Sequence, residues 1–241
     1  MEKVGLYHFV AEPYLTDFRG RVTLPMIGNY LIHAASGHAG ERGFGFNDMS
    51  ERHTAWVLSR LAIEMREYPA AFEEICLYTW IDEVGRLFTG RCFELADGRG
   101  KTFGFARSIW AAIDVETRRP TLLDGEALGA YITDRPCPIE KPGKIAPAES
   151  RSEGIPYTIK YSDLDINGHF NSVKYIEHLL DLFAIDQFRE GEIGRFEIAY
   201  QSEGKQGMSL ALHKAEAAPG KYDLAICHEG KAICRAAATW R

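Results

Sequence analysis

The feature that most constrains the fold is a pattern of hydrophobic periodicity that occurs twice along the chain. Each occurrence has a short extended run, then a helical stripe of apolar side chains, then several strand-like runs. In the first occurrence the extended run is residues 6–10, and the stripe, with apolar residues three or four apart, covers residues 27–38. The runs that follow alternate in polarity or are rich in aromatic and β-branched residues, which is typical of strands. They cover residues 56–67, 75–80, 87–95 and 103–115.

The second occurrence repeats this order. Its extended run is residues 157–161, and its helical stripe covers residues 170–183. Strand candidates follow at residues 196–201, 208–214, 222–228 and 232–240. One helix followed by at least four antiparallel strands, used twice at an offset of roughly 140 residues, predicts a duplicated α+β unit. Because a sheet must cover its apolar face, we expect each sheet to curve around its one long helix.

A proline-rich segment separates the two occurrences. Residues 135–150 contain four prolines and little apolar periodicity. Proline fixes φ and removes a hydrogen-bond donor, so this composition favours an extended connector. We therefore predict an N-terminal half at residues 1–134, a linker at residues 135–150, and a C-terminal half at residues 151–241.

Composition argues against several classes of protein. The chain has 241 residues, of which 46% are hydrophobic and 26% are charged, so it is neither disordered nor collagen-like. No window approaches the roughly 18 unbroken apolar residues of a membrane-spanning helix, and the first ten residues do not resemble a signal peptide. A formal net charge of −6 at pH 7 requires neither a nucleic acid nor a membrane as partner. We therefore expect a cytoplasmic protein.

Cysteine and histidine spacings do not indicate a disulfide framework or a metal site. The five cysteines are odd in number and form no C-x-x-C pair, so we interpret most of them as small core residues. His33 and His38 are five residues apart and do not share a helix face, and His38 lies on the apolar stripe. The run at residues 98–102 resembles only the tail of a phosphate-binding loop, because Leu95 stands where that loop needs glycine. We expect no metal and no cofactor.

Five polar residues alternate at the point where the second extended run meets the second helix. They are Asp163, Asp165, Asn167, His169 and Asn171. Aspartate and asparagine are favoured as helix caps, which accounts for one or two of these residues. Capping does not account for an alternating row of five that includes a histidine, so the row is the candidate functional site.

This row resembles the active-site signature of the acyl-acyl carrier protein thioesterases, a family known from plant plastids and also found in bacteria. The segment DLDINGHFNSVKYI at residues 163–176 is similar to that signature. The segments at residues 56–69 and 106–120 are similar to strands in the first half of the family. Because motifs from both halves occur in the same order and spacing, the resemblance covers nearly the whole chain.

The resemblance implies a fold and a set of catalytic residues. The fold is a double hotdog, in which two curved antiparallel sheets each wrap one long helix and together form a continuous sheet. The catalytic residues of the family fall on Asp165, Asn167, His169 and Glu203. The family often has a cysteine directly after the glutamate, where this chain has Gly204, so a cysteine nucleophile cannot act from that position.

The first half has a different sequence, RGRVTLPMIGN at residues 19–29, before its helix. It is therefore expected to supply the acyl pocket and not a second catalytic site. Met26, Tyr30, Trp56 and Leu58 could line such a pocket, but residues of these types are more often ordinary core residues.

These residue types suit hydrolysis of a thioester. Glu203 and His169 would hold and deprotonate a water molecule. Asn167 and backbone N–H groups near the helix start would position the thioester and stabilise charge on its oxygen, and Asp165 would orient its neighbours. The products would be a free fatty acid and holo-acyl carrier protein, which ends fatty acid synthesis.

The expected partner is an acidic acyl carrier protein, so docking needs a basic face on this acidic chain. Candidate docking residues are Arg107, Arg118, Arg119, Lys141, Lys144, Lys160 and Lys174. Two other functions stay open: a hotdog thioesterase acting on acyl-coenzyme A, and a non-catalytic acyl-binding double hotdog. Hydratases also have this fold, but the glutamate and the asparagine-containing row favour hydrolysis. A homo-oligomer is possible, and a prokaryotic source is expected because the chain starts directly at the first half.

Overall fold

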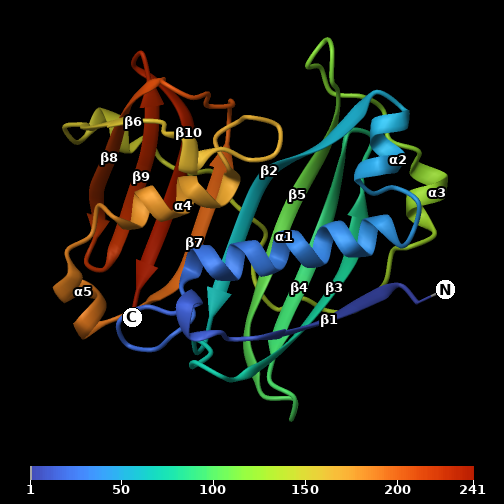
Figure 1. Cartoon of the computed structure of the whole chain (residues 1–241), viewed down its shortest axis with the longest axis horizontal. Helices are drawn as coiled ribbons and strands as arrows, with labels where there is room; N and C mark the ends of the chain where they lie inside the picture. Colours follow the sequence, from blue (N-terminus) through green and yellow to red (C-terminus); the bar gives the residue numbers. More distant parts are fainter. Residues whose placement is uncertain (1) are drawn as a thin grey trace. The chain divides into compact units, whose positions relative to one another are not determined.

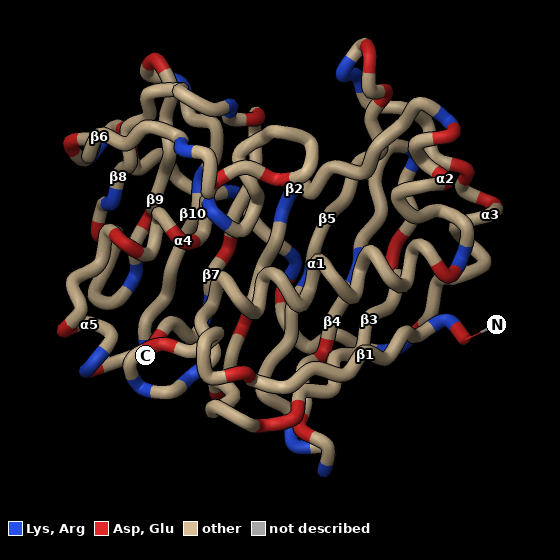
Figure 2. The backbone as a smooth tube through the Cα atoms, viewed as in Figure 1, with Lys and Arg blue, Asp and Glu red and all other residues tan. Residues whose placement is uncertain are grey.

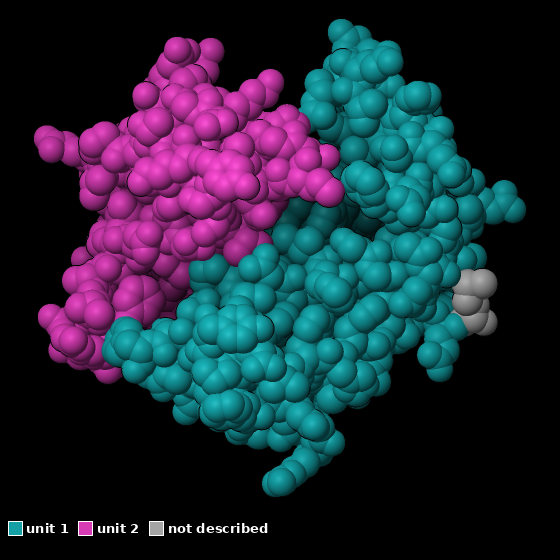
Figure 3. Space-filling model, viewed as in Figure 1, with its two compact units in different colours: residues 1–141 teal, residues 142–241 magenta. Residues whose placement is uncertain are grey.

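The computed structural model describes residues 2–241 (Figure 1). The chain divides into two compact units, one ending at Lys141 and the other beginning at Pro142 (Figure 3). Each unit combines an antiparallel sheet with one longest helix, which confirms the predicted α+β class. No helix within residues 2–241 is both long enough and apolar enough to cross a membrane.

Unit 1 contains a five-stranded antiparallel sheet. Its strands, in the order in which they pair, are β1 (Val4–Val10), β3 (Glu74–Val84), β4 (Phe88–Ala96), β5 (Thr102–Asp114) and β2 (Thr54–Met65). Each of these strands overlaps the strand-like run predicted for it, and the observed and predicted bounds differ by a few residues.

Helix α1 (Leu24–Gly40) lies against one face of this sheet and contacts β1 and β3 (Figure 1). Thr23 caps it by accepting a hydrogen bond from the N–H of Met26. Ile27 and Leu31 on the predicted stripe are 0% and 1% exposed, so the helical period correctly indicated the buried face.

Unit 2 repeats this plan. Its strands, in pairing order, are β7 (Ile193–Tyr200), β10 (Lys231–Trp240), β9 (Lys221–His228), β8 (Ser209–Ala218) and β6 (Ile155–Thr158). Helix α4 (Ser172–Leu180) contacts β8 and β9.

Helix α4 is shorter than the predicted stripe of residues 170–183. Phe170 and Phe183 are buried but lie outside the helix. Apolar periodicity reports burial, and these two rings are buried from the loops that flank the helix. The predicted extended run at residues 157–161 was also too long, because β6 ends at Thr158 and a 3-10 turn, η3, occupies Tyr161–Asp163.

Several short elements were not predicted from the sequence. They are α2 (Phe46–Glu51), α3 (Gly125–Gly129), α5 (Ile185–Glu190), η1 (Pro13–Leu15) and η2 (Ala148–Ser150). Each has at most one buried residue, so none carries the apolar stripe from which a helix is recognised.

Other expectations about single residues are confirmed. Four of the five cysteines are buried, Cys137 is partly exposed, and all are free thiols. His38 is 0% exposed and belongs to the core. Residues 97–101 form the turn between β4 and β5, in which the Asp97 carboxylate accepts two backbone hydrogen bonds, so this segment is a hairpin and not a phosphate-binding loop.

Candidate active site

The alternating polar row forms a tight loop that leads into α4. The Asp165 carboxylate accepts hydrogen bonds from the backbone N–H groups of Asn167, at 2.8 Å, and His169, at 3.0 Å. The backbone N–H of Asp165 donates to the carbonyl of His169, which closes the loop. Gly168 has a φ of +74°, a left-handed conformation that favours glycine. Aspartate at the first position and glycine at the fourth therefore set the shape of this loop.

The loop lies beside the segment that follows β7. The N–H of Phe170 donates to the carbonyl of Gly204 at 2.9 Å, and His169 forms an isolated β-bridge with Lys205. This pairing places Nε2 of His169 at 3.5 Å from Oε2 of Glu203. The two side chains are 25% and 35% exposed, so water and a substrate can reach them.

Asn167 lies at the tip of the loop and is exposed. Among residues 2–241, no hydrogen-bond partner is found for its side-chain amide. The amide is therefore available to a ligand. The Asp165 carboxylate, in contrast, is directed at the backbone of its own loop, where it shapes the positions of Asn167 and His169.

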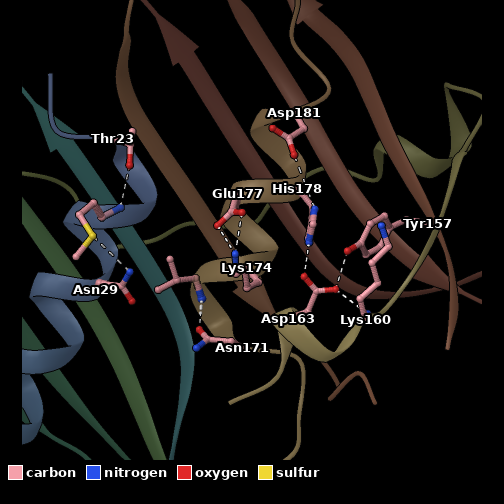
Figure 4. A network of polar contacts seen from close by, with 12 residues as sticks. Thr23, Asn29, Tyr157, Lys160, Asp163, Asn171, Lys174, Glu177, His178 and Asp181 are labelled. Atoms are coloured by element: carbon pink, nitrogen blue, oxygen red, sulfur yellow. Dashed lines mark hydrogen bonds and ion pairs between the residues drawn. The ribbon is translucent and has the colours of Figure 1, made fainter. Parts of the chain in front are cut away.

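The two outer residues of the row hold the loop in place (Figure 4). Asn171 caps α4 by accepting a hydrogen bond from the N–H of Val173 at 2.9 Å. Buried Asp163 accepts hydrogen bonds from the Tyr157 hydroxyl at 2.6 Å and from the N–H of Lys160, and lies 2.9 Å from Nε2 of His178. Burial raises the pKa of Asp163, but the hydrogen bonds outweigh it and leave the pKa below its usual value. Capping thus accounts for two of the five residues.

The position after Glu203 has no room for a side chain. A Cβ added to Gly204 would lie 2.6 Å from Cδ1 of Ile159 and 2.9 Å from Cβ of Phe170. A cysteine here would require these core side chains to move. The packing therefore agrees with chemistry that does not use a thiol at this position.

Unit 1 contains the same loop before α1, which the sequence analysis missed. The Asp17 carboxylate accepts hydrogen bonds from the N–H groups of Arg19, at 2.8 Å, and Arg21, at 3.1 Å, and Gly20 has a φ of +68°. Asp17 and Asp165 each precede the first residue of their helix by the same spacing. The shared D-x-x-G spacing was the signal that could have revealed this repeat.

The same comparison gives a counterpart in unit 1 for Glu203. The N–H of Val22 donates to the carbonyl of Pro69, as that of Phe170 donates to Gly204. The residue before Pro69 is Tyr68, which is buried. The position of Glu203 is therefore occupied by tyrosine in unit 1.

The basic residues considered for docking differ in how they are used. Arg107 is only 16% exposed and forms a 2.6 Å ion pair with Asp82, so it was a wrong choice for a docking residue. Lys141 pairs with Glu83 and Lys174 with Glu177. Arg118, Arg119, Lys144 and Lys160 are exposed. Basic and acidic residues are interspersed along the chain (Figure 2).

The four candidates for an acyl pocket have the features of core residues. Tyr30 and Leu58 are buried, and the Tyr30 hydroxyl donates to the carbonyl of Val10. Trp56 is partly buried and its Nε1–H donates to the carbonyl of Phe44 at 2.8 Å. Met26 is partly buried. Their polar groups are therefore satisfied within unit 1.

Two family models match the chain. The acyl-ACP thioesterase N-terminal domain matches residues 7–131, and the acyl-ACP thioesterase C-terminal domain matches residues 147–241. A solved acyl-ACP thioesterase from Bacteroides thetaiotaomicron is 44% identical, with a TM-score of 0.94 over 99% of this chain and 98% of that one.

Two plant proteins are more distant. The 12:0-ACP thioesterase from Umbellularia californica is 22% identical, with a TM-score of 0.86 over 100% of this chain and 98% of that one, and it shows the shared fold. The chloroplastic oleoyl-acyl carrier protein thioesterase 2 of Arabidopsis thaliana is 29% identical over 219 residues, which cover 82% of this chain. The chain spans 59% of the length of that relative. These matches confirm the hotdog-type fold that the signature implied.

Proposed function

The chain belongs to the acyl-ACP thioesterase family, and we propose that it hydrolyses acyl-acyl carrier protein to a free fatty acid and holo-acyl carrier protein. One observation carries this proposal. The imidazole of His169 and the carboxylate of Glu203 lie 3.5 Å apart and are accessible, and Asn167, two residues before His169 in the same loop, is exposed. Together they offer a base for water and a donor for the thioester oxygen.

The proposed reaction uses these groups in two steps. Water held by Glu203 and His169 attacks the carbonyl carbon, a C–O bond forms, and the pair takes up the proton. The Asn167 amide donates to the oxygen on which negative charge develops. The intermediate then collapses, the C–S bond breaks, and the proton passes to the departing thiolate.

Asp165 does not contact the substrate in this scheme. Its carboxylate accepts from the N–H groups of Asn167 and His169 and so fixes the residues that do the chemistry. The N-terminal half, residues 1–134, is proposed to contribute the acyl pocket, and the C-terminal half, residues 151–241, contributes the catalytic residues.

An acidic carrier protein would meet positive charge close to this site. Lys160 is exposed at the start of η3, and Lys205 is exposed two residues after Glu203. Charge on such residues mainly affects the rate of association and its dependence on salt. We propose these lysines, with Lys144, as docking residues, and we propose that the reaction ends fatty acid synthesis in the cytoplasm.

The test is thiol release by the purified protein from a panel of acyl chains, each on acyl carrier protein and on coenzyme A. Asn167→Ala and Glu203→Gln are measured beside the wild type. Faster turnover on carrier protein that falls at least 100-fold in both variants is the expected result.

Two other outcomes would change the proposed function. Equal or faster turnover on coenzyme A would assign the enzyme to acyl-coenzyme A hydrolysis. Tight binding of acyl chains without thiol release would indicate a non-catalytic acyl-binding protein.

A further inference from the structure

Tyr175 contacts the backbone on both sides of Glu203. It lies on α4, and its hydroxyl donates to the carbonyl of Ser202 at 3.3 Å and accepts from the N–H of Gly204 at 3.1 Å. The residue is 2% exposed. Burial raises the pKa of Tyr175 above its ordinary value, so the hydroxyl stays protonated and can donate.

The ring that carries this hydroxyl is itself fixed by its neighbours. It stacks on Phe170 with 4.1 Å between ring centroids and meets Tyr200 edge to face at 5.4 Å. The Tyr200 hydroxyl donates to the carbonyl of Ser172 at the start of α4. Phe170 also donates its N–H to the carbonyl of Gly204. The segment of Glu203 is therefore attached both to the loop of His169 and to the helix.

We propose that Tyr175 is a positioning residue of the active site, whose hydroxyl fixes the backbone around Glu203 and so holds its carboxylate opposite His169. The inference rests on the proposed function, because it assigns Tyr175 a role only through Glu203. A displacement of about 1 Å in a reacting group can lower a rate about 100-fold, so a clamp of this kind has a large effect on turnover.

The comparison with unit 1 separates this role from packing. Tyr175 and Ile27 occupy the same position counted from the start of α4 and α1. Both are buried, so an apolar side chain satisfies the packing requirement at this place. Unit 1 has Ile27 in place of Tyr175 and Tyr68 in place of Glu203. The hydroxyl is therefore present only in the unit that also has the glutamate.

Tyr175→Phe removes the hydroxyl and keeps the ring. We expect kcat to fall about 10- to 100-fold while KM changes less than about twofold, since the substrate-binding groups are untouched. Tyr222→Phe is the matched control, because the Tyr222 hydroxyl accepts a hydrogen bond from the Gln187 side chain at 3.1 Å, away from the candidate site. That variant should keep the wild-type kcat.

A double-mutant cycle with Glu203→Gln identifies the route of the effect. If Tyr175 acts through Glu203, Tyr175→Phe lowers single-turnover rates in the wild type but not in the Glu203→Gln background. An unchanged kcat in Tyr175→Phe, or an equal loss in both backgrounds, would overturn the inference. Wild-type turnover in Glu203→Gln alone would instead overturn the proposed role of Glu203, so the two failures are distinguishable.

Discussion

The loops before α1 and α4 share one backbone but differ in their side chains. Asp17 and Asp165 make the same pair of backbone hydrogen bonds, and each loop has a left-handed glycine. The residues that follow these aspartates differ, since unit 1 has Arg19 and Arg21 where unit 2 has Asn167 and His169.

This difference distinguishes the residues that shape the loop from those proposed to take part in the reaction. The guanidinium of Arg19 pairs with Asp17 at 3.0 Å, and that of Arg21 donates to the carbonyl of Tyr68 at 2.9 Å. The unit 1 loop therefore uses its polar groups within the protein. The aspartate is explained in both loops by backbone geometry. In the proposed reaction the chemistry comes from Asn167, His169 and Glu203, whose positions in unit 1 are occupied by Arg19, Arg21 and Tyr68.

The largest expected effect comes from exchanging the loop side chains. His169→Arg places a permanently charged group where unit 1 has Arg21, so the loop should fold, but no base remains at this position. We expect kcat/KM for acyl-acyl carrier protein to fall about 100- to 10,000-fold. Arg21→His, the reciprocal change, should leave kcat/KM within about twofold. A His169→Arg enzyme with near wild-type rates would show that the two loops do not differ in chemistry.

The next effect tests whether the two aspartates have the same structural role. Asp17→Ala and Asp165→Ala each remove two backbone hydrogen bonds to a carboxylate, which should lower the free energy of unfolding by about 2 kcal/mol. Asp17→Ala also removes the ion pair with Arg19, which is partly exposed and adds little. Only Asp165→Ala should also lower kcat. Urea unfolding and steady-state rates measure both quantities. A stability loss confined to one variant would contradict the shared scaffold.

Acid should destabilise the two units in different pH ranges. Burial, followed by the charges of Arg91 and Arg42, lowers the pKa of His38 in unit 1 to about 3. The unfolded chain binds a proton near pH 6.5 that the folded state does not bind, so stability is lost as pH falls below 6.5. At pH 5 the loss is about 2 kcal/mol. In urea unfolding, His38→Gln should not show this loss. If the free energy of unfolding of the variant falls between pH 6.5 and 5 as steeply as that of the wild type, the assignment to His38 is wrong.

For unit 2, the loss of stability in acid should begin at a lower pH than for unit 1. The pKa of Asp163 lies below its usual value, so the stability that this carboxylate contributes is present above about pH 4 and is lost as pH falls further. Asp163→Asn should therefore leave the slope between pH 6.5 and 5 unchanged, which makes it the control for His38→Gln in the same unfolding experiments.

The smallest effect concerns the two loop glycines. Gly20 and Gly168 have φ values of +68° and +74°, and an added Cβ would have nothing within 4 Å at either position. Gly20→Ala and Gly168→Ala should each cost about 1 kcal/mol through backbone conformation alone. Costs that differ by more than about 1 kcal/mol in thermal or urea unfolding would show that the two loops are not equivalent.

Local patterns in the sequence predicted most of the fold. The stripe at residues 27–38 lies within α1, and each predicted strand run corresponds to an observed strand. The errors occurred at ends, as at Phe170 and Phe183, where burial continues beyond the helix. Short helices such as α2 were not predicted, because they have too few buried residues to form a stripe.

The candidate site was predicted less completely. The alternating row indicated Asp165, Asn167 and His169, and the family resemblance added Glu203. Tyr175 was within the quoted signature but received no role, because its partners Ser202 and Gly204 are far from it in the sequence. Arg107 was assigned to the surface because no local pattern shows that Asp82 neutralises it.

The sequence by itself determined the duplicated α+β plan, the family signature and the residue types available for chemistry, because these depend on local periodicity and on composition. Only the tertiary structure decided which residues meet. The register of the loop against the segment after β7 brings His169 to Glu203, and the packing of α4 brings Tyr175 to the peptides around Glu203. Such contacts depend on the relative placement of distant segments, which is fixed by the whole sheet and not by neighbours in the chain.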